Sequence, residues 1–270
     1  MNWTLPEEFE TDEGVIRWAR FGGGADPIVL VHGTAFSSFL WRDIAPALAL
    51  SRPVFVFDHL GYGQSDKRDG QDLTLAAQGR RFARLLEHWG LDAPSVVAHD
   101  IGGAIVLRAL LREGSTYRDL ALLDAVSGGH WEGGLFSLIR SNSEVFERLP
   151  EYAFTAIAAS HFRNASHLGL RPEVLEAFLE PWRGQAGQDA YYRQYRQLSE
   201  ADTADYETEL AGIDVPVKVL WGREDRILPP AHGVWLDEQI PHATLHWIDD
   251  AGHLVQEDAP AQLLALLLAR

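Results

Sequence analysis

Residues 95–104 could carry chemistry, because a β-branched apolar run changes there into a helix around one acidic residue, Asp100. Small residues stand two positions away on either side, at Ala98 and Gly102. A tight strand-to-helix turn needs such neighbours, since its central residue adopts a strained backbone conformation. The central side chain then projects beside a helix N-terminus, whose N–H groups stabilise negative charge. An isolated aspartate there would more often cap the helix, so the rest of the chain decides its role.

Three further motifs accompany this turn, in a fixed order along the chain. His32-Gly33-Thr34-Ala35 and Asp58-His59-Leu60-Gly61-Tyr62-Gly63-Gln64-Ser65 precede it, and the pair Asp225 and His253 follows it. With these four motifs the chain resembles the α/β-hydrolase superfamily over nearly its whole length. Within it, the chain is similar to the Asp-nucleophile branch, which includes epoxide hydrolases and haloalkane dehalogenases.

The resemblance implies a role for each of these residues. Asp100 stands at the nucleophile of the elbow, and His253 at the general base. Asp225 is the favoured orienting acid because it closes the strand before the His253 loop, with Asp124 as competitor after the preceding strand. The backbone N–H groups of Thr34 and Ile101 would form the oxyanion hole.

Apolar runs and helical periodicity indicate an α/β fold that would bring these residues to one sheet edge. Buried runs predict parallel strands with helices on both faces. Residues 127–211 contain no convincing buried strand and favour helices instead. We therefore expect an α/β-hydrolase core made by residues 1–126 and 212–270, with residues 127–211 as an inserted helical cap. The strands are expected at residues 13–21 (as an edge strand), 28–32, 54–57, 120–123, 215–221 and 244–248 and in the apolar run that begins at Ser95. The core helices are expected at residues 39–49, 73–89, 101–112, 231–240 and 259–269.

A carboxylate nucleophile points to displacement at saturated carbon. It is ionised at neutral pH and would form an alkyl ester on Asp100. His253, oriented by Asp225, would activate water against the ester carbonyl, and the Thr34 and Ile101 N–H groups would hold the oxyanion. This chemistry selects epoxides and alkyl halides as substrates.

The leaving-group donors favour the epoxide. Haloalkane dehalogenases have a Trp after the nucleophile and many have an Asn in the His-Gly loop, where this chain has Ile101 and Thr34. Epoxide hydrolases of this fold use cap tyrosines to protonate the ring oxygen. Tyr192-Arg193-Gln194 resembles their second tyrosine motif, Tyr152 is the candidate for the first, and His161 could serve instead.

Two other functions stay open. A hydrolytic dehalogenase could take its halide donors from Trp131 or Trp182. A non-catalytic homologue could keep the fold and bind small molecules without turnover.

Composition excludes several partners and cofactors. The net charge of −16 argues against nucleic acid and anionic membrane surfaces. The acidic N-terminal residues do not resemble a signal peptide, and no apolar run is long enough to span a bilayer. The absence of cysteine is consistent with the cytoplasmic location that we expect. We expect neither a metal nor an organic cofactor. The expected partners are a small apolar organic substrate and water, and the sequence leaves open whether the protein forms a homo-oligomer.

Overall fold

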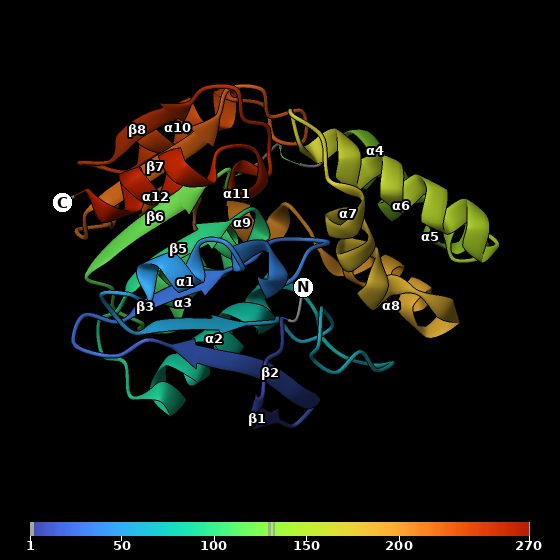
Figure 1. The fold of residues 1–270 in the computed structure, drawn as a ribbon, viewed down its shortest axis with the longest axis horizontal. Helices are drawn as coiled ribbons and strands as arrows, with labels where there is room; N and C mark the ends of the chain where they lie inside the picture. Colours follow the sequence, from blue (N-terminus) through green and yellow to red (C-terminus); the bar gives the residue numbers. More distant parts are fainter. Residues whose placement is uncertain (1–2, 129–130, 132, 270) are drawn as a thin grey trace.

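The centre of the computed structural model, which describes residues 3–128, 131 and 133–269, is one eight-stranded sheet (Figure 1). Its strands lie in the order β1-β2-β4-β3-β5-β6-β7-β8. The first two are antiparallel to their neighbours, and all other pairs are parallel. This is the α/β-hydrolase arrangement that the sequence predicts. The strands are β1 (Glu7–Thr11), β2 (Gly14–Phe21), β3 (Ile28–Val31), β4 (Val54–Phe57), β5 (Ser95–His99), β6 (Asp119–Leu123), β7 (Val217–Gly222) and β8 (Thr244–Ile248).

Helices cover both faces of this sheet and produce two apolar layers. One layer contains Phe82 of α2 and Leu107 of α3, and the other contains Leu48 of α1 and Leu263 of α12. The central strands β3, β4 and β5 are therefore buried throughout, as their continuous apolar sequences require. The helices of this part are the short 3₁₀ helix η1 (Ser38–Trp41), α1 (Ala45–Leu48), α2 (Leu75–Trp89), α3 (Ile101–Arg112), α10 (Ala231–Gln239), α11 (Val255–Asp258) and α12 (Pro260–Leu268).

The strand register places the carboxyl ends of the parallel strands along one edge. His99 is opposite Leu123, Leu123 is opposite Leu220, and Gly222 is opposite Ile248. Loops that follow these strands must therefore emerge together. In open α/β sheets this is the edge where ligands bind.

A helical insertion, residues 134–212, lies between β6 and β7, and its described residues contain no strand. Figure 1 shows α4 to α8 grouped beside one end of the sheet. Hydrogen bonds fasten it to the core: Trp182 Nε1 donates to the Ala35 carbonyl at 3.0 Å, and Gln197 Nε2 to the Gln71 carbonyl at 2.9 Å. Its helices are α4 (Gly134–Ser141), α5 (Ser143–Phe146), α6 (Glu151–Ala165), α7 (Pro172–Leu179), η2 (Glu180–Trp182), α8 (Gly184–Gln197), α9 (Ala201–Ala204) and η3 (Glu207–Gly212).

The N-terminal edge of the sheet differs from the expected one. Residues 13–21 were expected at the edge, but β1 covers β2 and takes that place. The glutamates of β1 weaken its strand signal, although they suit an exposed edge, where charge discourages pairing with another chain. Residues 39–49, expected as one helix, form η1 and α1 instead.

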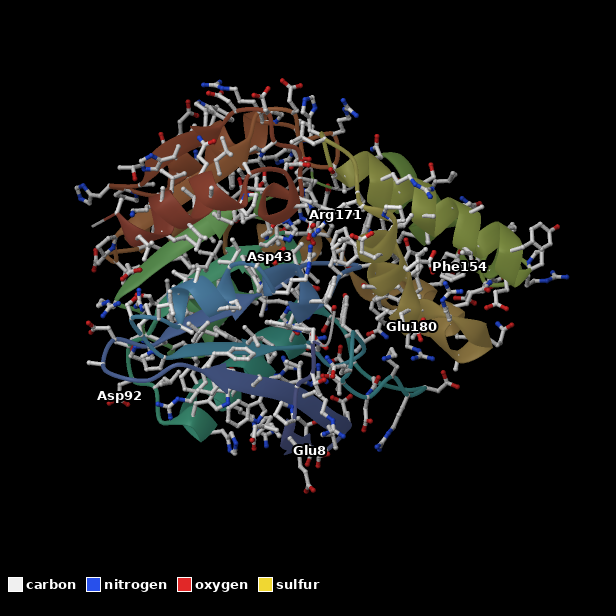
Figure 2. All side chains as sticks on the ribbon, viewed as in Figure 1. Glu8, Asp43, Asp92, Phe154, Arg171 and Glu180 are labelled. Carbon is white, nitrogen blue, oxygen red and sulfur yellow. The ribbon has the colours of Figure 1, made fainter. Side chains whose placement is uncertain are left out.

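Acidic side chains project from the surface on several sides, among them Glu8, Asp92 and Glu180 (Figure 2). They belong to the excess that produces the net charge of −16. Among the helices of the described residues, none is long and apolar enough to cross a membrane.

Candidate active site

The turn at Asp100 joins β5 to α3 and has the strained geometry expected for it. Asp100 adopts φ 55° and ψ −126°, and its side chain makes no capping hydrogen bond to α3. Gly33 allows the opposite loop to come close, because a Cβ added there would lie 2.3 Å from the Asp100 Cβ. The alternative that Asp100 is a helix cap therefore fails on geometry, and its carboxylate is available for another role.

The two oxygens of the Asp100 carboxylate have different surroundings. Oδ1 accepts a hydrogen bond of 2.7 Å from the Thr34 backbone N–H. Oδ2 lies 3.5 Å from His253 Nε2. The Ile101 backbone N–H is one of the groups that lower the pKa of this carboxyl, whose side chain is only 5 % exposed. The Thr34 N–H is thus directed at one oxygen while the histidine faces the other.

His253 is oriented by Asp225. Nδ1 of the imidazole is 2.9 Å from Asp225 Oδ2, and a carboxylate can only accept, so Nδ1 carries the proton. Asp225 Oδ1 in turn accepts from the N–H groups of Ile227 and Leu228 at 2.7 and 2.9 Å. These bonds hold the carboxylate in place and leave Nε2 facing Asp100.

Asp124, the competing acid, occupies a different position. Its Oδ1 accepts a 2.9 Å hydrogen bond from the Gly222 N–H, which ties β6 to β7. Burial, reinforced by the charge of Asp225, raises the pKa of the Asp124 carboxyl well above its usual range. Both effects favour the neutral form of Asp124, and Asp225 is the acid that contacts His253.

Charges inside the site favour an ion pair between His253 and Asp100. Burial alone would lower the pKa of His253, but Asp225 and Asp100 together outweigh it and raise that pKa well above its usual range. Burial would likewise raise the pKa of Asp100, but His253, His99 and the Ile101 N–H lower it below its usual value. Both shifts favour an imidazolium beside a carboxylate in the free protein.

Asp258 connects the His253 loop to the helical insertion. Its Oδ2 accepts from the N–H groups of Gly252 at 2.9 Å and His167 at 2.8 Å. Its Oδ1 accepts from the Ser166 hydroxyl at 2.6 Å and from the Leu168 N–H at 3.1 Å. One carboxylate therefore sets the loop before His253 against the end of α6.

A cavity of about 420 Å³ opens above Asp100. This volume lies in the range that accommodates small organic ligands. The core and the insertion both line it. Its apolar lining is Ile101, Val126, Trp131, Leu135, Phe136, Ile227, Leu228 and Pro229, and its polar lining is Thr34, Asp100, His161, Asn164, Tyr195, Arg226 and His232.

Tyr195 and His161 are the hydroxyl and imidazole that the insertion supplies to this cavity. The Tyr195 hydroxyl is 3.5 Å from His161 Nε2 and 3.2 Å from the Tyr191 hydroxyl. Burial raises the pKa of Tyr195 well above its usual value, so it remains a phenol. Burial, together with the charge of His253, lowers the pKa of His161 to about 4, so this imidazole is neutral at pH 7.

The two cap tyrosines expected from the sequence do not line the cavity. Tyr152 is 79 % exposed, and the ring of Tyr192 packs against Phe146 and Phe154. Tyr192 precedes Tyr195 by three residues, which shifts it roughly 4.5 Å along the helix and rotates it by about 60°. His161 was considered from the sequence, whereas Tyr195 was missed, although it follows the Tyr-Arg-Gln motif directly.

The Tyr-Arg-Gln motif has a docking role in the structure. Arg193 donates to the Arg68 carbonyl at 2.9 Å and pairs with Asp69. Gln194 is fully buried and accepts a short hydrogen bond from the Thr34 hydroxyl. The motif thus fastens α8 to the loop that bears the Thr34 N–H.

The indole N–H groups suggested as halide donors have other partners. Trp131 Nε1 donates to the Thr203 hydroxyl at 2.8 Å, although its ring lines the cavity. Trp182 Nε1 donates to the Ala35 carbonyl. Within the described part of the chain no group of three or more His, Asp or Glu side chains is arranged to hold a metal ion.

The family model for the α/β-hydrolase fold matches residues 26–260, so the chain belongs to this family. An α/β-hydrolase fold protein from Burkholderia ambifaria is 40 % identical, with a TM-score of 0.96 over 99 % of this chain and 98 % of that one. The acetyltransferase component of an acetoin cleaving system from Cupriavidus necator is 29 % identical over 96 % of this chain and 67 % of its own. A haloalkane dehalogenase from Agrobacterium tumefaciens has a TM-score of 0.81 at 24 % identity, over 97 % of this chain and 94 % of its own; this likeness shows the fold alone. Because the relatives of this chain include hydrolases, we expect the protein to be an enzyme.

Proposed function

We propose that the protein is an epoxide hydrolase that works through a covalent ester on Asp100. The observation that carries this proposal is that the two oxygens of the Asp100 carboxylate have different neighbours. The Thr34 N–H donates to Oδ1, and His253 lies beside Oδ2. A phenol that stays protonated, Tyr195, lines the same cavity. Residues 127–211 then act as the cap that roofs this site, over a core of residues 1–126 and 212–270.

In the first half-reaction Asp100 Oδ2 attacks a carbon of the epoxide. The ring C–O bond breaks, and its electron pair goes to the ring oxygen, which takes the proton of Tyr195. Oδ1 stays against the Thr34 N–H and becomes the carbonyl oxygen of the ester. Neutral His161 helps to orient the Tyr195 hydroxyl through their 3.5 Å contact.

Ester formation prepares His253 for the second half-reaction. Asp100 loses its charge, so one of the two anions that raise the pKa of His253 disappears. The imidazolium then transfers its own proton to the Tyr195 phenolate, which restores the phenol. His253 becomes neutral and able to act as a base, still oriented by Asp225.

Water completes the reaction. His253 Nε2 takes a proton from water, and the hydroxide adds to the Asp100 ester carbonyl. The Thr34 and Ile101 N–H groups stabilise the oxyanion. Collapse expels the alkoxide, which takes the proton from His253, and the Asp100 carboxylic acid then protonates His253 to restore the starting ion pair. The product is a diol.

The donor arrangement favours an epoxide over an alkyl halide. Both indole N–H groups considered for halide already bond to protein acceptors, Thr203 and Ala35. The Tyr195 phenol, in contrast, can supply the proton that a departing ring oxygen requires. The substrate we expect is small and mostly apolar, because most of the cavity lining is apolar.

The test separates the two half-reactions. His253→Gln should form the ester and fail to hydrolyse it, so incubation with styrene oxide should increase the protein mass by one whole substrate. Asp100→Asn should show no adduct. His246→Gln is the matched control, because it makes the same substitution in β8, where His246 Nε2 is 3.2 Å from the Thr244 hydroxyl and, within the described part of the chain, does not line the cavity. It should behave as wild type.

Isotope labelling tests the site of water attack. In heavy-oxygen water, a single wild-type turnover should place the label in the Asp100 carboxylate and leave the first diol unlabelled. Label in the first diol would overturn the nucleophile assignment. Stoichiometric halide release from haloalkanes, with no diol from any epoxide, would identify a dehalogenase, and binding without any turnover would identify a non-catalytic homologue.

A further inference from the structure

The mouth of the cavity carries a cation that the proposed chemistry does not use. Among the described residues that line the cavity, Arg226 is the sole Lys or Arg. It is exposed, whereas Asp100, Ile101 and Leu228 at the inner end are buried. Arg226 therefore stands at the entrance, with exposed Asn164 as a second polar neighbour.

Arg226 also has no partner within the described part of the chain, neither an ion pair, a hydrogen bond nor an aromatic contact. Arg148 and Arg163 share this property but do not line the cavity, whereas most arginines of this acidic protein, in which carboxylates outnumber Lys and Arg by 39 to 23, have partners. Arg223, three residues earlier, illustrates the ordinary case, since its Nε lies 2.5 Å from Asp249. A guanidinium left unpaired at a ligand cavity is free to bind an anion bidentately.

The backbone around Arg226 is held in place by the catalytic constellation itself. Asp225 Oδ1 accepts the N–H groups of Ile227 and Leu228, on the far side of Arg226. Asp225 Oδ2 contacts His253. The backbone that carries the cation is thus held relative to the reacting groups, and the apolar lining belongs to the same cavity.

We infer that the substrate carries an anionic group, a carboxylate, which Arg226 binds at the mouth while the apolar body fills the cavity and the epoxide meets Asp100. This deepens the proposed function and rests on it for the reacting group. A cation at the mouth also offsets the repulsion between an anionic substrate and the buried Asp100 carboxylate.

The experiment compares two matched epoxides, 3-phenyloxirane-2-carboxylate and its neutral carboxamide. Wild type should prefer the carboxylate, and this preference should fall as salt is added. Arg226→Gln should lower kcat/KM for the carboxylate about tenfold, mainly through KM, because the pair is exposed and partly screened. The carboxamide should be unaffected, and Arg226→Lys should restore part of the loss.

Arg223→Gln is the matched control. It removes an exposed arginine of the same loop that pairs with Asp249 and does not line the cavity. It should leave both substrates unchanged. Equal turnover of the two epoxides by wild type, or an equal loss for both in Arg226→Gln, would overturn the inference.

A binding measurement separates this inference from the proposed chemistry. Cinnamate and cinnamamide have no epoxide, so calorimetry with them does not depend on turnover. Wild type should bind cinnamate more tightly, and Arg226→Gln should abolish that difference. If no epoxide reacts but cinnamate still depends on Arg226, the proposed function fails and the anion site stands. If epoxides react but the charge of the ligand has no effect, the anion site fails and the proposed function stands.

Discussion

The core and the helical insertion contribute to the cavity in different ways. Asp100, Asp225 and His253 each follow a strand, and the sheet register gathers these strand ends at one edge. Tyr195 and His161 lie on two helices, α8 and α6, where a residue's direction depends on the rotation and packing of its helix. Residues that follow neighbouring parallel strands come together because the strands pair, whereas residues on different helices come together only when the helices have packed.

The largest expected effect would test this difference at the two tyrosines of α8. Tyr195→Phe should slow epoxide opening by ~10²–10⁴-fold, the usual loss for one proton donor. Its ring can still pack against Phe136 and Tyr191. Tyr192→Phe, the matched control, should change the rate less than about threefold, because loss of an uninvolved hydroxyl leaves the donor in place. Single-turnover ester formation is the measurement, and the opposite ranking would return the proton donor to Tyr192.

Acidic pH should separate the two half-reactions of the core. In the ester only the charge of Asp225 still raises the pKa of His253 against the effect of burial, and lowering the pH converts the neutral base to its inactive imidazolium. Ester hydrolysis should fall about tenfold per pH unit below the pKa that His253 has in the ester. Ester formation should persist to lower pH, because the pKa of Asp100 is lowered. Mass spectrometry of quenched reactions should therefore show ester accumulating in acid; a parallel loss of both steps would contradict this.

A smaller effect is expected where the two regions are joined. Asp258→Asn places an amide N–H₂, itself a donor, against some of the groups that donate to Asp258. These groups include the N–H groups of Gly252 and His167. Unpaired donors should displace the His253 loop and lower kcat roughly tenfold, the scale of ~1–3 kcal/mol for such a group. The pH profile of ester hydrolysis should shift to lower pH, because a looser contact with Asp225 raises the pKa of His253 less.

Asp249→Asn is the control for this variant. It removes one charge from a side chain that is 72 % exposed, four residues before His253. Activity and pH profile should stay those of wild type. If Asp258→Asn lowers only the melting temperature and leaves the pH profile unchanged, Asp258 stabilises the fold without positioning His253.

Sequence reasoning succeeded where local chemistry dictates conformation. The buried apolar run at residues 54–57 predicted β4 with its observed bounds, the strand expected at residues 244–248 matches β8, and Gly90 ends α2 in the left-handed conformation expected of a C-terminal glycine. It failed at β1, whose glutamates conceal the strand pattern. It also left Asp124 and Asp225 as competitors, because both follow parallel strands and only side-chain direction separates them.

The sequence by itself therefore determined the fold family, the strained turn at Asp100 and the order of the residues that meet there. These depend on small residues, strand patterns and chain order, which are local properties. Only the tertiary structure decided that Asp225 contacts His253, that Tyr195 lines the cavity in place of Tyr192, and that Arg226 stands at its mouth without a partner among the described residues. Such facts depend on how helices rotate against the sheet, and many weak packing contacts determine that rotation together.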